Sequence, residues 1–272
     1  MRCRLWQPAM PEPRPPRQQK LPGAVKISVI TAVYNRRDTL ADAVRSLQSQ
    51  TYEEFEHVVM DAQSTDGSLE LLEELADKRM KLSSKPDDGI YDALNKGMKK
   101  STGNVIGLMH SDDFFASDGV LELVARAFED RGVDAVYGDL DYVSAANPDR
   151  VIRHWVSGAY HRSKLKRGWM PPHPALYIRR EVVERWGGYD TSYQIAADYD
   201  AILRWFGRGR ITAHYEPHVF VKMRVGGESN RSLERVAQKS REDYRALRAN
   251  EVGGIGALAW KNLSKLGQFR AR

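Results

Sequence analysis

The sequence predicts an α/β fold with a mostly parallel central β-sheet. From Lys26 to about Tyr137, short runs of β-branched and apolar residues alternate with helical segments of about ten to fifteen residues, which is the order expected of βαβ units. Polar or acidic residues follow four of the apolar runs. Because open α/β sheets bind ligands at the carboxyl ends of their strands, this part of the chain also predicts a ligand site.

The individual elements follow from hydrophobic periodicity. The run KISVITAVY predicts a buried first strand, and the helix after it carries an apolar stripe formed by Leu40, Ala43, Val44 and Leu47. After about residue 140 the alternation loosens, although further strands and helices are still expected. The predicted strands cover residues 26–34, 55–60, 81–84, 105–109, 135–137, 151–156, 175–179, 211–215 and 219–225, and the later helices cover residues 180–187 and 196–207.

The composition is that of a soluble globular protein, with 272 residues of which 42% are hydrophobic and 29% charged. The single cysteine, Cys3, excludes an internal disulfide, which fits a reducing cytoplasm. No apolar stretch approaches the roughly 18 residues of a membrane span, and no apolar segment of a secretory signal follows the first charges. We therefore predict a cytoplasmic domain at residues 25–230, preceded by a disordered, Pro-rich basic tail at residues 1–24.

The net charge of +6 is concentrated at the two ends of the chain. Residues 1–24 carry +4 and residues 231–272 carry +6, whereas residues 25–230 hold 27 Lys or Arg against 31 Asp or Glu. This acidic central part argues against a nucleic-acid-binding protein. Residues 231–272 are expected to form a helical extension that either contacts an anionic membrane surface or docks on the domain. Its apolar face contains Ile255, Leu258, Ala259, Leu266 and Phe269.

Acidic residues at predicted strand ends are the candidate functional groups. Asp112 and Asp113 follow the strand VIGLM after His110 and Ser111. A pair of carboxylates at such a strand end holds Mg²⁺ or Mn²⁺ in some proteins and only caps the next helix in others. The same two interpretations, ligand binding or capping, apply to the polar loop that begins at Asp61. Asp198 and Asp200 lie at a predicted helix start. A carboxylate there can act as a general base, or it can simply interact favourably with the helix dipole.

Several common catalytic and nucleotide-binding motifs are missing from the sequence. It contains neither a G-x-x-x-x-G-K-[ST] nor a G-x-G-x-x-G segment. The histidines show no zinc-binding spacing, and no G-x-S-x-G nucleophile motif occurs. A P-loop nucleotidase, a dinucleotide-dependent enzyme and a serine or cysteine hydrolase are therefore not supported.

The order of the loops resembles family 2 glycosyltransferases of the GT-A fold. The similar segments are KISVITAVYNRRDTL, SLQSQTYEEFEHVVMDAQSTDGS, PDDGIYDALNKGMKKSTGNVIGLMHSDD, HPALYIRREVVERWGGYD and AADYD, from about Lys26 to Ser229. The segment GIYDALNKG is similar to the branch found in bacterial exopolysaccharide and lipopolysaccharide assembly. Two positions differ from many members, which have Asp at the place of His110 and Asp or Gly at the place of Ala62.

The resemblance implies transfer of a sugar from a nucleotide-sugar to a saccharide or lipid-linked acceptor, with inversion at the anomeric carbon and with Mn²⁺ or Mg²⁺ as cofactor. It implies that Asp113 coordinates the metal on the diphosphate and that Asp198 is the catalytic base. The residues implied in donor binding are Thr31, Tyr34, Asp61, Asp88 and Asp112. Two alternatives remain, a nucleotidyltransferase and an inactive homologue that binds carbohydrate or a partner.

Overall fold

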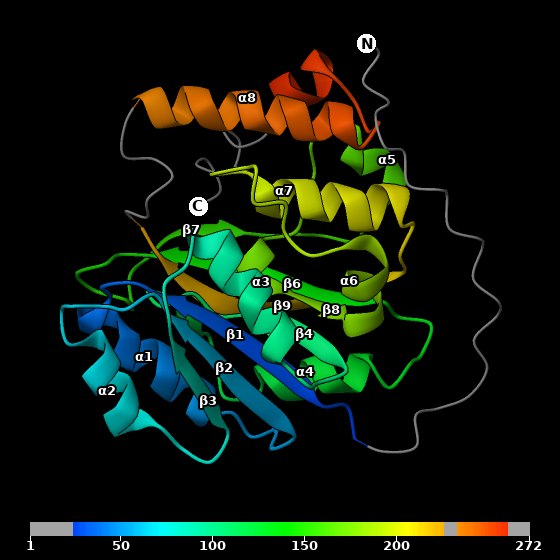
Figure 1. Ribbon diagram of the computed structural model, residues 1–272. Coiled ribbons are helices and arrows are strands. Elements are labelled where there is room, and N and C mark those ends of the chain that lie inside the picture. Colours follow the sequence, from blue (N-terminus) through cyan, green and yellow to red (C-terminus); the bar gives the residue numbers. More distant parts are fainter. Residues whose placement is uncertain (1–23, 226–232, 261–272) are drawn as a thin grey trace, which may run out of the picture.

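The computed structural model describes residues 24–225 and 233–260, and it forms one nine-stranded sheet with helices on both faces (Figure 1). The strand order is β3-β2-β1-β4-β8-β6-β9-β5, with β7 paired to β6. The strands are β1 Ile27–Val33, β2 Phe55–Asp61, β3 Met80–Ser84, β4 Val105–Leu108, β5 Phe114–Phe115, β6 Ala135–Val143, β7 Val151–Trp155, β8 Leu176–Arg179 and β9 Ala213–Arg224.

The sheet has a parallel half and a mixed half. Strands β3, β2, β1 and β4 are all parallel neighbours, as the alternation of strands and helices predicts. Beyond β4, strand β8 pairs antiparallel with both β4 and β6, and β6 pairs parallel with β9. The helices are α1 Arg37–Gln48, α2 Ser68–Leu75, α3 Ile90–Lys100, α4 Val120–Ala127, α5 Arg162–Leu165, α6 Arg180–Trp186, α7 Ala197–Ile202 and α8 Leu233–Ala249.

Apolar residues on both faces of the sheet form the core. On one face α3 packs against β1 and β2, and the approach is so close that a Cβ added to Gly97 would lie 2.5 Å from a methyl group of Ile30. On the other face α1 contributes the predicted stripe of buried apolar side chains. Helices therefore cover both faces of the sheet, which leaves the ends of the strands as the place where a ligand can approach.

Strand β9 differs from the two strands predicted for residues 211–215 and 219–225, because the chain continues as one strand through Pro217. Its pairing with β6 shifts register between Tyr137 and Asp139, which face Tyr215 and Val219 respectively. The extra residues on β9 form a bulge, so the missing N–H of Pro217 removes no regular ladder hydrogen bond. The predicted helix at residues 196–207 also changes character, since α7 continues as a π-helical turn over Leu203–Arg208.

The segment after residue 232 begins with α8, which packs against α7 (Figure 1). After α8, Val252 and Ala257 are buried in the core, whereas Ile255 is 73% exposed. Leu266, Phe269 and the N-terminal tail at residues 1–23 lie outside the described residues. In the part of the chain that is described, no helix combines the length and the apolar character needed to cross a membrane.

Candidate active site

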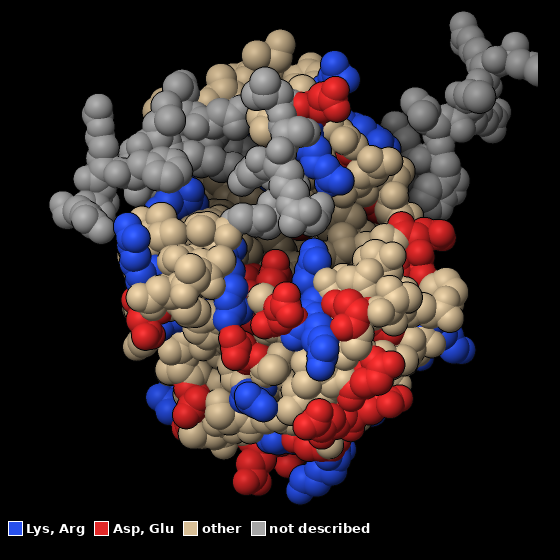
Figure 2. Space-filling model, turned by 90° about the vertical axis from the view of Figure 1, so that its left-hand side faces the viewer, with Lys and Arg blue, Asp and Glu red and all other residues tan. Residues whose placement is uncertain are grey.

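Tyr34, Asp61, Asp88 and the Asp112–Asp113 pair follow or end parallel strands at their carboxyl ends, whereas Thr31 lies inside β1 and Asp198 lies in α7. Strands β1, β2 and β4 end at one edge of the sheet because they are parallel neighbours. Figure 2 looks onto this side of the molecule and shows acidic and basic side chains next to one another in the middle of it. The sheet thus brings together loops that are far apart in the sequence.

The loops after β1 and β2 are fastened to each other. Asn35 has a left-handed backbone with φ 52°, and its N–H donates to the Ser64 hydroxyl over 2.9 Å. The carboxylate of Asp61 accepts from the N–H of Ser64 (3.2 Å) and from the hydroxyl of Ser84 (2.6 Å). Tyr34 stays 61% exposed beside this structure. The exposed ring of Tyr34 on this fixed loop is suited to stacking on a flat ligand group. The carboxylate of Asp61, in contrast, is used in hydrogen bonds that shape the loop after β2.

Thr31 and Asp88 lie in very different surroundings. The hydroxyl of Thr31 is buried and lies 2.9 Å from Nε2 of His57, and burial lowers the pKa of His57 to about 4. Asp88 is exposed in the turn before α3, where its N–H donates to Asp92. Of these two predicted donor-binding residues, only Asp88 presents its side chain to solvent.

The Asp112–Asp113 turn follows β4 and is held by Arg224 of β9. The backbone N–H of Arg224 donates to Oδ1 of Asp113 (3.2 Å), and its guanidinium donates to the carbonyl of Asp112 (2.7 Å). The same guanidinium pairs with Asp42 of α1 and lies over the ring of Phe114. Arg224 therefore fixes the backbone of this turn from a strand more than 100 residues away in the sequence.

Asp113 is a buried carboxylate with one unused oxygen. Its side chain is 1% exposed, and within the described residues its Oδ2 has no hydrogen-bond partner. Burial raises the pKa of Asp113 well above its ordinary value, the negative charge of Asp112 adds to this, and Arg224 opposes it. Asp112 is only partly buried. A cation next to the pair would relieve the cost of ionising Asp113.

Asp198 contacts a histidine that in turn contacts a second histidine. Nδ1 of His173 lies 3.1 Å from Oδ2 of Asp198, and Nε2 of His173 lies 2.7 Å from Nε2 of His110. His110 precedes the Asp112–Asp113 turn, so the series connects the two predicted acidic sites. The hydroxyl of Tyr91 donates to the carbonyl of Ile195 (2.6 Å) and lies 3.4 Å from Asp198. Burial and the neighbouring His173 lower the pKa of His110 to about 4.

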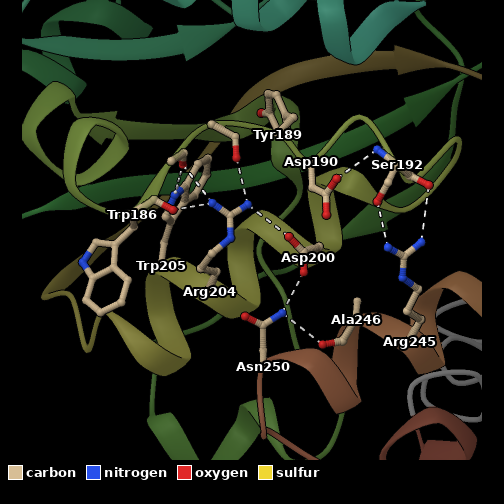
Figure 3. Close-up of polar contacts among 12 residues, drawn as sticks. Trp186, Tyr189, Asp190, Ser192, Asp200, Arg204, Trp205, Arg245, Ala246 and Asn250 are labelled. Carbon is tan, nitrogen blue, oxygen red and sulfur yellow. Dashed lines mark hydrogen bonds and ion pairs between the residues drawn. The ribbon is translucent and has the colours of Figure 1, made fainter. Parts of the chain in front are cut away.

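Asp200, the other carboxylate of α7, has a structural environment (Figure 3). Its Oδ2 pairs with Arg204 at 3.0 Å, and its Oδ1 accepts from Asn250 at 2.8 Å. Arg204 also donates to the carbonyls of Gly187 and Gly188. These contacts tie α7 to the end of α8 and to the loop after α6, so Asp200 is committed to holding α7 in place.

Helix α8 also holds the backbone that leads into α7. The carboxylate of Glu242 accepts from the N–H groups of Gln194 (3.3 Å), Ile195 (2.8 Å) and Ala196 (3.0 Å). Because these donors precede the first residue of α7, Glu242 supplies the negative charge that a helix start favours. The segment carrying Asp198 is therefore anchored from the C-terminal part of the chain.

Sequence reasoning did not single out His173, Arg224 or Glu242. His173 lies inside the segment HPALYIRR, which carried the family resemblance, so that segment was the available signal. Arg224 and Glu242 act through contacts between distant parts of the chain, for which no local pattern exists.

Comparison with protein families gives one consistent result. The model of glycosyl transferase family 2 matches residues 28–186. An uncharacterized glycosyltransferase of Mycobacterium tuberculosis is 28% identical over 265 residues, which cover 88% of this chain and 97% of that protein. A PGL/p-HBAD biosynthesis glycosyltransferase of Mycobacterium bovis is 29% identical over 213 residues, covering 76% and 80% of the two chains.

Solved structures share the fold at lower identity. The crystal structure of S. aureus TarS 1-349 in complex with UDP-GlcNAc matches with a TM-score of 0.62 and 19% identity, covering 84% of this chain and 66% of that chain. The mannosyltransferase PcManGT from Pyrobaculum calidifontis in complex with GDP-Man and Mn²⁺ matches with a TM-score of 0.63 and 19% identity, covering 91% and 73%. The predicted GT-A α/β fold is confirmed.

Proposed function

The chain belongs to glycosyl transferase family 2, and we propose that it transfers a sugar from a nucleotide-sugar to an acceptor hydroxyl with inversion at the anomeric carbon. The observation that carries this proposal is the pair of distinct acidic sites at one sheet edge. The Asp112–Asp113 turn is buried and has an unused carboxylate oxygen, whereas Asp198 is held apart from it by two histidines.

The donor is proposed to lie across the loops after β1, β2 and β4. Tyr34 offers an exposed ring for the base, and Asp88 and Asp112 offer carboxylates, whereas the buried Asp61 holds the loop after β2 in shape. Thr31 would support the floor of this site, since its hydroxyl faces His57. The bound molecules of two structural neighbours, UDP-GlcNAc and GDP-Man, support a nucleotide-sugar as the donor class.

The residues present suit a divalent metal such as Mn²⁺ or Mg²⁺, with Asp113 as the proposed ligand and its buried, unused Oδ2 as the fitting atom. Among the described residues, no three acidic, histidine or cysteine side chains form a complete metal cage. Magnesium-type ions are commonly held by one or two carboxylates together with substrate phosphates. When bound, such an ion offsets the charge that develops on a diphosphate leaving group. The Mn²⁺ in the mannosyltransferase complex supports this choice.

Asp198 is the proposed general base. Its side chain is only 16% exposed, yet it lies at the start of α7 where an acceptor hydroxyl approaches from outside. Inversion requires the acceptor oxygen to attack from the face opposite the leaving diphosphate, while a carboxylate takes its proton. One carboxylate site for the metal and another for the proton fit this division of roles.

We propose cell-envelope polysaccharide or glycolipid synthesis as the context, with a saccharide or a lipid-linked saccharide as acceptor. The relative named for PGL/p-HBAD biosynthesis supports a biosynthetic role, and the GIYDALNKG segment supports the exopolysaccharide or lipopolysaccharide branch. A lipid-linked acceptor implies work at the inner face of the cytoplasmic membrane. The basic extension at residues 231–272 would then contact anionic lipid there.

A panel of nucleotide-sugars tests the proposed reaction. The purified chain is incubated with Mn²⁺ and UDP-, GDP- or dTDP-sugars, and released nucleoside diphosphate is measured. We expect release from one donor class, which chelation of the metal abolishes. Pyrophosphate release from a nucleoside triphosphate would instead identify a nucleotidyltransferase. If the chain binds donors but releases no nucleoside diphosphate with any saccharide or lipid-linked acceptor, it is an inactive homologue.

Liposome co-sedimentation tests the membrane contact. Vesicles with anionic lipid should retain the chain at low salt and release it as salt rises, because screening weakens surface attraction. Deletion of residues 261–272 leaves the buried Val252 and Ala257 in place, so it should weaken retention while the protein stays folded. Deletion of residues 252–272 removes both, and unfolding of that variant would show that the segment serves as a docked part of the domain.

A further inference from the structure

His173 connects two parts of the site that the sequence separates widely. It lies in the 3₁₀ turn His173–Ala175 that precedes β8, whereas His110 follows β4 and Asp198 lies in α7. The contacts are 3.1 Å from Nδ1 of His173 to Asp198 and 2.7 Å between the Nε2 atoms of the two histidines. The two imidazole rings also meet edge to face, with centroids 5.0 Å apart. The series therefore has defined geometry on both sides of His173.

The chemistry of the two groups indicates where one proton lies in this series. Nδ1 of His173 and Oδ2 of Asp198 approach to 3.1 Å as an ion pair, and because an ionised carboxylate can only accept, a hydrogen bond between them requires the proton on Nδ1. This holds whether His173 is neutral or charged. The contact between the two Nε2 atoms is satisfied in either case, because one nitrogen donates and the other accepts. His110 can thus hold the far nitrogen of His173 while Asp198 engages the near one.

We propose that His173 is a positioning residue for catalysis, which holds the carboxylate of Asp198 through its Nδ1–H and is itself held by His110. This inference rests on the proposed function, in which Asp198 is the base. A base that is displaced by about 1 Å from its productive position can lose about a hundredfold in rate. His110 then has a role as the support of His173.

The proton on His173 can be observed without any substrate. Long-range ¹H–¹⁵N spectra of the full chain with ¹⁵N-labelled histidine report which ring nitrogens carry a proton. The His173 signals are identified by their disappearance in His173→Asn or His173→Gln, whichever folds. We expect a protonated Nδ1 in His173. A His173 ring that is protonated at Nε2 alone would overturn the proposal.

Two substitutions then separate positioning from packing. The side-chain amide of Asn places an N–H near the position of Nδ1, whereas that of Gln places it near Nε2. We expect His173→Gln to lower kcat by about 10- to 100-fold with the KM for the donor nearly unchanged, and His173→Asn to recover most of the rate. In the Asp198→Asn background, His173→Gln should cause little further loss, because both changes act through one carboxylate.

A matched control is available in β7. His154 lies 2.5 Å from Asp141, so His154→Gln removes a similar His–Asp contact that has no place in the proposed site, and its kcat should match wild type. Equal kcat for wild type and His173→Gln would overturn the inference while leaving the proposed function intact. If wild type turns over no nucleotide-sugar, the proposed function fails instead. An equal loss of kcat in His173→Asn and His173→Gln would show a packing role and would also overturn it.

Discussion

Glu56 and Asp113 are buried carboxylates at opposite ends of the parallel half of the sheet, and their surroundings differ sharply. Glu56, at the amino end of β2, accepts from the hydroxyl of Ser28 (2.7 Å) and that of Thr102 (2.9 Å), and it pairs with Lys81 at 2.6 Å. Asp113, beyond the carboxyl end of β4, accepts from one backbone N–H and keeps an unused oxygen.

The pKa values of the two carboxylates follow from these surroundings. Burial alone would raise the pKa of Glu56, but hydrogen bonds from Lys81, Thr102 and Ser28 lower it to about 2. Burial raises the pKa of Asp113, and too few donors oppose it. A buried charge without partners is costly, and such groups concentrate at functional sites. The buried carboxylate at the amino end of the sheet is therefore fully engaged by its neighbours, whereas the one at the carboxyl end has an unused oxygen, which fits the metal proposed there.

The largest expected effect is on turnover, from Asp198→Asn. The amide keeps the size of the side chain but cannot take the proton of the acceptor, so we expect a loss of about 10²–10⁴ in kcat with donor binding retained. Asp200→Asn is the matched control, because Asp200 is engaged by Arg204 and Asn250 and should affect stability more than rate. Steady-state kinetics with the donor from the panel decides this. Normal turnover by Asp198→Asn, or a dead Asp200→Asn that still folds, would contradict the assignment.

A smaller effect is expected on stability, from Glu56→Gln. Losing charge-assisted hydrogen bonds should cost about 1.5–3 kcal/mol in the free energy of unfolding, with kcat unchanged. The folded pKa of Glu56 lies below its ordinary value of 4.5, so this stabilisation is complete above the unfolded pKa and is lost as the pH falls toward about 2. Denaturant unfolding should show a gap between wild type and variant that narrows from about pH 6 to about pH 3. A gap that does not change with pH would mean that the ionised form of Glu56 is not the stabilising one.

The comparison also shows what a sequence reveals about each end. Strands β1 and β2 and the stripe of α1 were predictable because their signal is local and periodic. Asp113 and Asp198 could be singled out because an acidic residue after an apolar run marks a strand end or a helix start. Their assigned roles came from the resemblance and stay predictions.

The rest of the site depends on contacts that have no local pattern. His173 meets His110 across 63 positions of sequence, and Arg224 meets Asp113 across 111. The bulge that carries β9 past Pro217 likewise depends on pairing with β6. Long-range contacts of this kind depend on how all the strands and helices are arranged, so only the structure reveals them.

Metal-linked binding of a nucleoside diphosphate tests the difference between the two ends most directly. UDP and GDP are titrated by calorimetry into wild type, Asp113→Asn and Glu56→Gln, each with Mn²⁺ and with chelator. We predict that Mn²⁺ tightens binding of one diphosphate at least about tenfold, or about 1.4 kcal/mol, in wild type and Glu56→Gln and that Asp113→Asn loses this gain. Equal affinity with metal and with chelator in wild type, or an undiminished metal effect in Asp113→Asn, would contradict the account.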